Sequence, residues 1–309
     1  MNALSEITAA PPAVRAVPLK FMIGARTLFA VERRLVRVAL SLAEARLAVL
    51  PTLPPLPADA DGYIVTSLPE ALLPQFGRAF VRQRYTRYWL DFAGGFDAWF
   101  ETLSSNARQG LRRKARKLAA QSGGTLDIRR FRTPAELSAF HAIAREVSQR
   151  TYQERLLDSG LPEDAGFIET MRALAAAGRV RTWLLYVADA PIAYLYCPAQ
   201  GDTLIYAHVG HDPAFNDLSP GAVLQLEAVR DLFAEGAFIS FDFTEGEGQH
   251  KRQFASGGVA CADLLLLRPT LANRALLAAL RGFDGAVALA KRAVQRGGFQ
   301  EWTKRVRRG

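Results

Sequence analysis

The sequence has little cysteine and no metal-binding motif. Its 309 residues include only two cysteines, Cys197 and Cys261, and both lie in apolar, strand-like segments. Buried free thiols are the usual form of such residues in a reducing compartment. No Cys-x-x-Cys or cysteine–histidine spacing indicates a metal site, and His208 and His211 lack an evident third ligand. We predict two structural cysteines, no bound metal and no tightly bound cofactor.

Long apolar runs and a signal peptide are missing as well. The uncharged stretch at 190–201 has 12 residues, whereas a transmembrane helix needs about 20. Residues 1–18 have no basic start followed by an apolar run, and Glu6 interrupts them early. No Gly-x-Gly-x-x-Gly follows a predicted strand, and there is no Walker-type lysine loop. We therefore predict a cytoplasmic protein outside the common nucleotide-binding classes.

Positive charge is in excess, and it is concentrated in two segments. The net charge is +9; residues 106–132 hold nine Lys or Arg against one acid, and residues 271–309 hold nine against two. Such basic surfaces suit nucleic acid, anionic lipid or a phosphate-bearing substrate. For the C-terminal segment we predict peripheral contact with an anionic inner-membrane surface.

The pattern of elements predicts an α+β fold. Strands are predicted at 62–67 and 84–92, followed by a helix over 96–121. From residue 125 onward the order is strand, two helices, three strands, helix and two strands, and the last 40 residues look helical and basic. The three central strands follow one another closely and should form an antiparallel meander: 180–188, 190–198 and 203–210.

Two helix starts stand out in the second half. Thr133 and Pro134 provide an N-cap and a first-turn proline for a helix that should run to about Arg155. Ser219 and Pro220 open another, which should end near Gly236.

Three short motifs resemble those of a known family. In chain order they are LSSNARQGLRRK at 103–114, HDP and LSPG at 211–213 and 218–221, and DF, G and HKRQF at 242–243, 246 and 250–254. Their order and spacing resemble the CelD-type polysaccharide-biosynthesis acetyltransferases, a branch of the GNAT superfamily related to the Fem peptidyl ligases. The resemblance covers residues 84–268.

This resemblance implies a GNAT-like mixed, largely antiparallel sheet flanked by helices. It divides the chain into a shortened, degenerate N-terminal GNAT-like unit (1–102), an acyltransferase domain (103–270) and a basic helical C-terminal tail (271–309). The implied reaction moves an acetyl or longer acyl group from acyl-CoA, as co-substrate, to an amine or hydroxyl. The acceptor would be a small-molecule or glycan-type compound, such as an envelope or polysaccharide precursor.

Two departures from the family pattern keep a non-catalytic alternative open beside an enzymatic one. His250 stands where the family has tyrosine, and residues 216–221 replace the usual phosphate loop, (Q/R)-x-x-G-x-(G/A). One alternative is Fem-like transfer from aminoacyl-tRNA, the single case in which we expect nucleic acid as a partner. The other is a non-catalytic adaptor that keeps the fold and docks through its basic patches.

The turn into the helix after Ser219 is the predicted donor site. A helix N-terminus presents unpaired N–H groups and a partial positive charge, which suit a pyrophosphate, and Gly221 allows a ligand to approach the backbone. A plain helix cap is the alternative, and the resemblance favours donor binding. The predicted donor-binding residues are Ser219, Pro220, Gly221, Ala222 and Val223.

Lys251, His250 and Asp242 are the predicted catalytic residues. An ammonium near the reacting carbonyl stabilises an oxyanion, and the Fem ligases imply this role at the position of Lys251. His250 titrates near neutral pH and so suits a base. Asp242 ends an apolar strand and is either a satisfied structural acid or a base in a cleft.

We predict that the acceptor binds to the basic part of the helix expected over 96–121. Arginines bind phosphate or carboxylate well, although such a cluster is also typical of a solvated helix face. The predicted substrate-binding residues are Asn106, Arg108, Arg112, Arg113 and Asp212.

Overall fold

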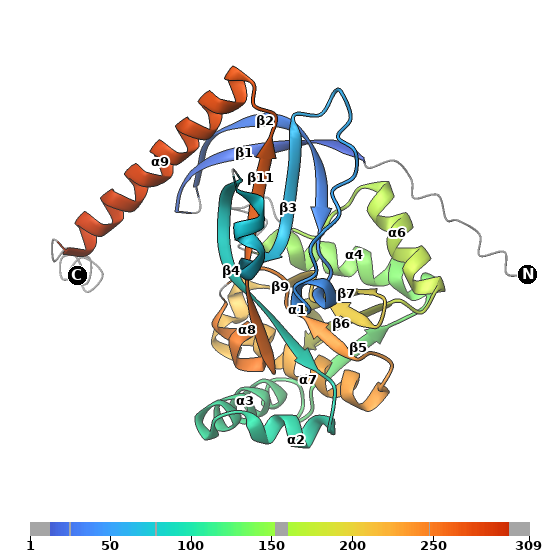
Figure 1. Cartoon of the computed structure of the whole chain (residues 1–309). Helices are drawn as coiled ribbons and strands as arrows, with labels where there is room; N and C mark the ends of the chain where they lie inside the picture. The colour runs from blue at the N-terminus through green and yellow to red at the C-terminus, as the bar shows by residue number, and fades with distance from the viewer. Residues whose placement is uncertain (1–12, 25, 78, 152–159, 247, 297–309) are drawn as a thin grey trace, which may run out of the picture. The chain divides into compact units, whose positions relative to one another are not determined.

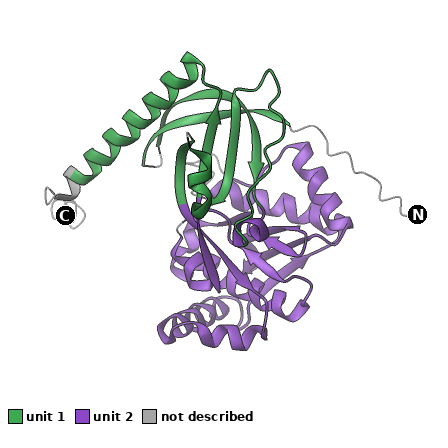
Figure 2. Ribbon diagram, in the orientation of Figure 1, with its two compact units in different colours: residues 1–40, 47–84, 262–309 green, residues 41–46, 85–261 purple. Residues whose placement is uncertain are grey.

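The computed structural model describes residues 13–296, except 25, 78, 152–159 and 247 (Figure 1). The contacts between residues divide the chain into two compact units (Figure 2). Unit 1 takes residues 1–40, 47–84 and 262–309, and unit 2 takes residues 41–46 and 85–261. This grouping does not follow the sequence-based division at 102/103 and 270/271, since the predicted tail helix, α9 (Leu271–Arg296), groups with unit 1.

Unit 1 is a small sheet with one long helix. β1 (Val14–Ile23), which the sequence analysis did not predict, forms an antiparallel hairpin with β2 (Arg26–Ala39). β2 then pairs in parallel with β3 (Gly62–Pro69). The core of this unit joins Leu19 and Phe21 to Leu276 and Leu280 of α9. The remaining predicted tail, 297–309, lies outside the described residues, so its contact with a membrane stays a prediction.

Unit 2 contains the predicted meander. β6 (Val180–Val187) pairs antiparallel with β7 (Ala190–Gln200), and β7 pairs antiparallel with β8 (Thr203–Ile205). β5 (Asp127–Phe131) adds antiparallel to β6. With helices beside it, this sheet confirms the predicted α+β fold with a mixed, largely antiparallel sheet flanked by helices.

The strand predicted at 203–210 is instead two shorter strands, and the sheet opens at the break between them. β8 pairs in parallel with β10 (Ser240–Asp242), whereas β9 (His208–His211) pairs with β7. Tyr206 N–H still donates to Asp242 O at 2.9 Å, but Phe243 N–H donates to Tyr88 O at 3.0 Å. The two neighbouring segments therefore separate immediately after Asp242.

The helix predicted over 96–121 is two helices, α2 (Gly95–Thr102) and α3 (Ser105–Ala120). Leu103 is extended (φ −70°, ψ 147°), and the Ser104 side chain accepts a hydrogen bond from Ala107 N–H. A serine N-cap of this kind starts a new helix. The apolar period alone did not show the break because both helices bury residues in one core.

The remaining helices of unit 2, in chain order, are α1 (Leu42–Arg46), α4 (Pro134–Arg150), α6 (Ala165–Ala176), α7 (Pro220–Glu235) and α8 (Gln249–Phe254). A 3₁₀ turn lies at Pro213–Leu218. α4 begins with the capping box of Thr133 and Glu136, and its predicted end falls among residues 152–159, outside those described. α8 was not predicted. Two strands cross the division between the units: β4 (Phe80–Asp91) and β11 (Gly257–Leu267).

Cys197 and Cys261 are both buried thiols, as predicted. Within the described ranges, no helix is long and apolar enough to cross a membrane.

Candidate functional site

Asp242, the last residue of β10, lies in a buried ion pair. Its side chain is 1% exposed, and Arg87 Nη2 is 2.5 Å from its Oδ2. Thr244 N–H donates to Oδ1 at 2.8 Å. The carboxylate therefore binds a guanidinium and a backbone amide, and it holds the turn that follows β10. Of the two roles open to Asp242, this geometry fits the structural acid.

The turn after β10 leads into α8 and returns to Lys251. Thr244 (φ 60°) and Gly246 (φ 111°) both lie in the left-handed region, where glycine is favoured. The half-buried Lys251 ammonium donates to the Glu245 carbonyl. Burial lowers the pKa of Lys251, while the negative charges of Glu245 and Asp242 act in the opposite direction.

His250, next to Lys251 in the chain, lies near an aromatic side chain that the sequence analysis did not single out. Its ring centroid is 6.2 Å from that of Tyr206, the residue after β8. Desolvation, and then the charge of Lys251, lower the pKa of His250. Burial raises the pKa of the Tyr206 hydroxyl. The structure thus brings His250, Lys251 and Tyr206 together where β8 and β10 end.

The first turn of α7 begins at Pro220, as predicted, but Ser219 does not cap it as expected. Ser219 adopts the left-handed conformation (φ 52°, ψ 50°), and its side chain makes no capping hydrogen bond. Its carbonyl instead accepts from the N–H groups of Ala222 and Val223, at 3.1 and 3.3 Å. Pro220 and Val223 are buried. Proline has no backbone N–H, and that of Val223 already donates to Ser219, so neither offers a ligand an unpaired N–H group.

Gly221 remains accessible on this turn. It is half-buried, and a Cβ placed there would lie 3.5 Å from Nδ1 of His211. The other ring nitrogen of His211 is 2.8 Å from Oδ1 of Asn216. A ligand approaching the backbone at Gly221 would therefore meet the His211 imidazole as well.

Asp212, predicted to bind substrate, is occupied by protein contacts. Its Oδ1 accepts from Ala214 N–H at 2.9 Å, and its Oδ2 is 2.9 Å from Arg150 Nη1. Asp212 is 8% exposed. These contacts make Asp212 the N-cap of the 3₁₀ turn that precedes α7. Asp212 therefore stabilises the backbone that leads into that helix.

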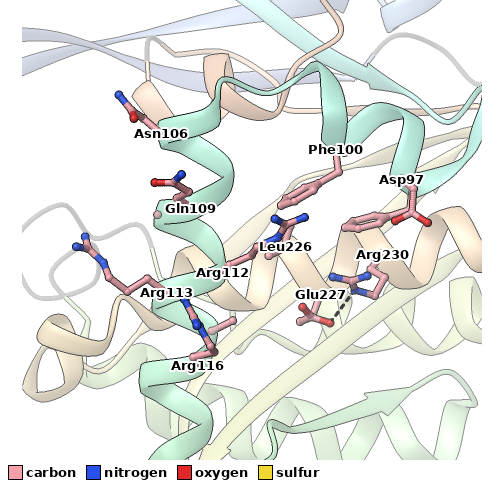
Figure 3. A pocket seen from close by; sticks show the side chains of 13 residues that line it. Asp97, Phe100, Asn106, Gln109, Arg112, Arg113, Arg116, Leu226, Glu227 and Arg230 are labelled. Atoms are coloured by element: carbon pink, nitrogen blue, oxygen red, sulfur yellow. Dashed lines mark hydrogen bonds and ion pairs between the residues drawn. The ribbon is translucent and has the colours of Figure 1, made fainter.

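The other predicted substrate-binding residues lie on α3, beside a groove enclosed by α2, α3 and α7 (Figure 3). The groove has a volume of about 1010 Å³. Asn106, Arg112 and Arg113 line it, whereas Arg108 pairs with Glu101 at 2.6 Å and does not. Gln109, Arg116 and Arg230, which were not predicted as site residues, complete its polar lining together with Asp97 and Glu227.

Part of the chain is similar in sequence to a known protein family. Residues 105–252 match the family described as an acetyltransferase (GNAT) domain, and no curated protein matches the chain. Three matching solved structures are FemX (10% identity, 83% of this chain and 89% of that chain, TM-score 0.48), L-PGS from Bacillus licheniformis (12%, 71% and 72%, 0.48) and the GCN5-related N-acetyltransferase from Kribbella flavida (12%, 68% and 70%, 0.38). The matched segment runs from α3 into α8 and contains Lys251. Residues 105–252 are thus similar in sequence to the acetyltransferase (GNAT) domain, and the observed mixed sheet is consistent with a GNAT-like fold.

Proposed function

We propose that unit 2 is an acyltransferase that moves an acetyl or longer acyl group from acyl-CoA to an amine or hydroxyl of a polar envelope- or polysaccharide-type precursor. The observation that carries the proposal is the position of Lys251. Its half-buried ammonium lies just beyond the point where β8 and β10 separate, inside the segment that matches the acetyltransferase family.

The donor is proposed to bind at the first turn of α7. The positive end of a helix favours a pyrophosphate, and Gly221 gives access to the backbone there. In the described part of the chain, β9 pairs only with β7. An extended donor arm can therefore add to the other edge of β9, as peptides add to exposed strand edges.

In the proposed reaction, the acceptor nitrogen or oxygen bonds to the thioester carbonyl carbon, and the carbon–sulfur bond then breaks. Neutral His250 accepts the proton of the attacking group. The protonated amine of Lys251 stabilises the oxyanion that forms in between. The CoA thiolate leaves and takes up a proton. Asp242 acts by position, since its bonds to Arg87 and Thr244 hold the turn that carries this pair.

The test is acceptor-dependent release of the CoA thiol, measured with a panel of acyl-CoAs and of polar amines and alcohols. Donor binding is measured separately by calorimetry. We expect micromolar-to-millimolar binding of at least one acyl-CoA, in the usual range for enzyme substrates, together with turnover. Transfer from charged tRNA and not from acyl-CoA would replace the proposal with aminoacyl transfer. Binding of neither donor would contradict both and favour the adaptor.

A further inference from the structure

We infer that the groove between α2, α3 and α7 is a second anion site, distinct from the first turn of α7, and that it binds a ligand with two or more linked phosphoryl groups. The inference deepens the proposed function, because such a ligand is either the phosphorylated part of the CoA donor or a diphosphate-bearing acceptor. The two sources share one chemistry, and the experiment below separates them.

The groove has more positive charge than its own acids neutralise. Four arginines from two helices line it, against two acids, Asp97 and Glu227. Glu227 is already engaged, since its Oε2 is 3.2 Å from Nε of Arg230. Arg113 and Arg116 are exposed, and neither has an acidic partner among the described residues. Guanidinium groups in this state form bidentate, charge-assisted hydrogen bonds with phosphate oxygens.

Two of the four arginines are oriented before any ligand arrives. The guanidinium carbon of Arg230 lies 4.0 Å from the ring centroid of Phe96, and that of Arg112 lies 5.1 Å from the ring centroid of Phe100. A guanidinium that contacts a ring face keeps its N–H groups available at its edge. Because these side chains are already ordered, binding loses less conformational entropy.

The spacing of the charges favours an extended anion over a single carboxylate. Arg112 and Arg116 are four residues apart on α3, a rise of about 6 Å, and Arg230 comes from a different helix. Two linked phosphoryl groups can contact two such guanidiniums at once. The amides of Asn106 and Gln109 add donors and acceptors for the remaining oxygens. The volume of about 1010 Å³ also leaves room for the rest of a nucleotide-sized ligand.

The groove is connected to the proposed catalytic residues through α2. Phe96 and Phe100 of α2 form its aromatic wall. On the same helix, Trp99 Nε1 donates to the carbonyl of Phe254 at 3.3 Å, and the two rings are 5.5 Å apart. Phe254 is the last residue of α8, the helix that carries Lys251. Helix α2 thus lines the groove on one side and contacts α8, the helix that carries Lys251, on the other.

The experiment uses inorganic diphosphate as the probe, titrated into the full chain by calorimetry. Arg113→Gln and Arg116→Gln should each weaken binding about tenfold, the loss of one charge-assisted contact. Lys114→Gln is the matched control, because it removes one charge from the same helix at a position outside the groove lining. We expect its affinity to stay within about twofold. Equal affinity in all four proteins, or an equal loss in the control, would overturn the inference.

Acetyl-CoA identifies the source of the phosphoryl groups. If it displaces diphosphate and binds more weakly to Arg113→Gln, the groove holds the donor. If its binding is unchanged while kcat/KM for the acceptor falls, the groove holds a phosphorylated acceptor. Diphosphate binding needs no turnover. A protein that binds diphosphate in the groove but transfers no acyl group would therefore contradict the proposed function and leave this site standing.

Discussion

The guanidinium of Arg87 and the carboxylate of Asp242 form a buried ion pair across β4 and β10, with Nη2 2.5 Å from Oδ2. Removing one partner leaves a buried charge without compensation, which destabilises a protein by about 3–5 kcal/mol. Arg87→Met should therefore lower the free energy of unfolding by about that amount, measured by urea denaturation.

The double variant Arg87→Met/Asp242→Leu is its control, since it removes both charges together. It should recover most of the lost stability but not the activity, because the turn loses its bond to Thr244. Unchanged stability in Arg87→Met alone would show that the pair does not hold this turn.

Replacement of Lys251 separates an enzyme from an adaptor. Lys251→Ala should lower kcat about a hundredfold or more, the usual effect of losing one oxyanion donor. Acyl-CoA affinity should barely change, because the contact forms mainly in the transition state. Lys251→Arg should rescue poorly, since a guanidinium places its donors differently. Arg252→Ala, next to it on α8, is the matched control. Wild-type rates in Lys251→Ala would rule out this residue as the oxyanion donor.

The rate should depend on pH through two groups. The pKa of His250 is lowered from its ordinary 6.5, so the neutral base forms, and kcat/KM rises, at a pH below 6.5. The pKa of Lys251 is lowered from its ordinary 10.5, so the ammonium is lost, and the rate falls, at a pH below 10.5. The expected profile is bell-shaped.

His250→Gln tests the acid side of this profile. It should reduce the rate and abolish the rise below pH 6.5, while the fall at high pH remains. An acid limb that persists unchanged in His250→Gln would mean that another group accepts the proton.

Gly221 tests the proposed donor site. A Cβ there would be in ordinary contact with His211, at 3.5 Å, so Gly221→Ala should fold normally. Gly221→Val should cover the backbone and weaken acyl-CoA binding at least tenfold, about 1.4 kcal/mol. Calorimetry and a melting curve measure both effects. Full affinity in a folded Gly221→Val protein would remove this turn from the donor site.

Local signals in the sequence were enough for most elements of unit 2. The Thr133–Pro134 start, the close spacing of β6, β7 and β8, and Pro220 at the first position of α7 all act over a few residues. Hydrogen bonding and sterics within one turn determine such features. The six residues of α8 were missed because they are too few to show a helical period.

Side-chain partners from distant positions could not be predicted in the same way. Asp242 could be a base or a structural acid from its sequence alone, and only pairing with Arg87, 155 positions away, distinguishes the two. Arg116 lies one turn beyond Arg112 and could have been inferred from the helical period. Arg230 could not, because α7 meets α3 only in the folded chain. The sequence by itself determined most of the helices and strands of unit 2, since those choices depend largely on neighbouring residues. Only the tertiary structure decided which charges are neutralised and which remain available to a ligand, because that depends on which segments pack together.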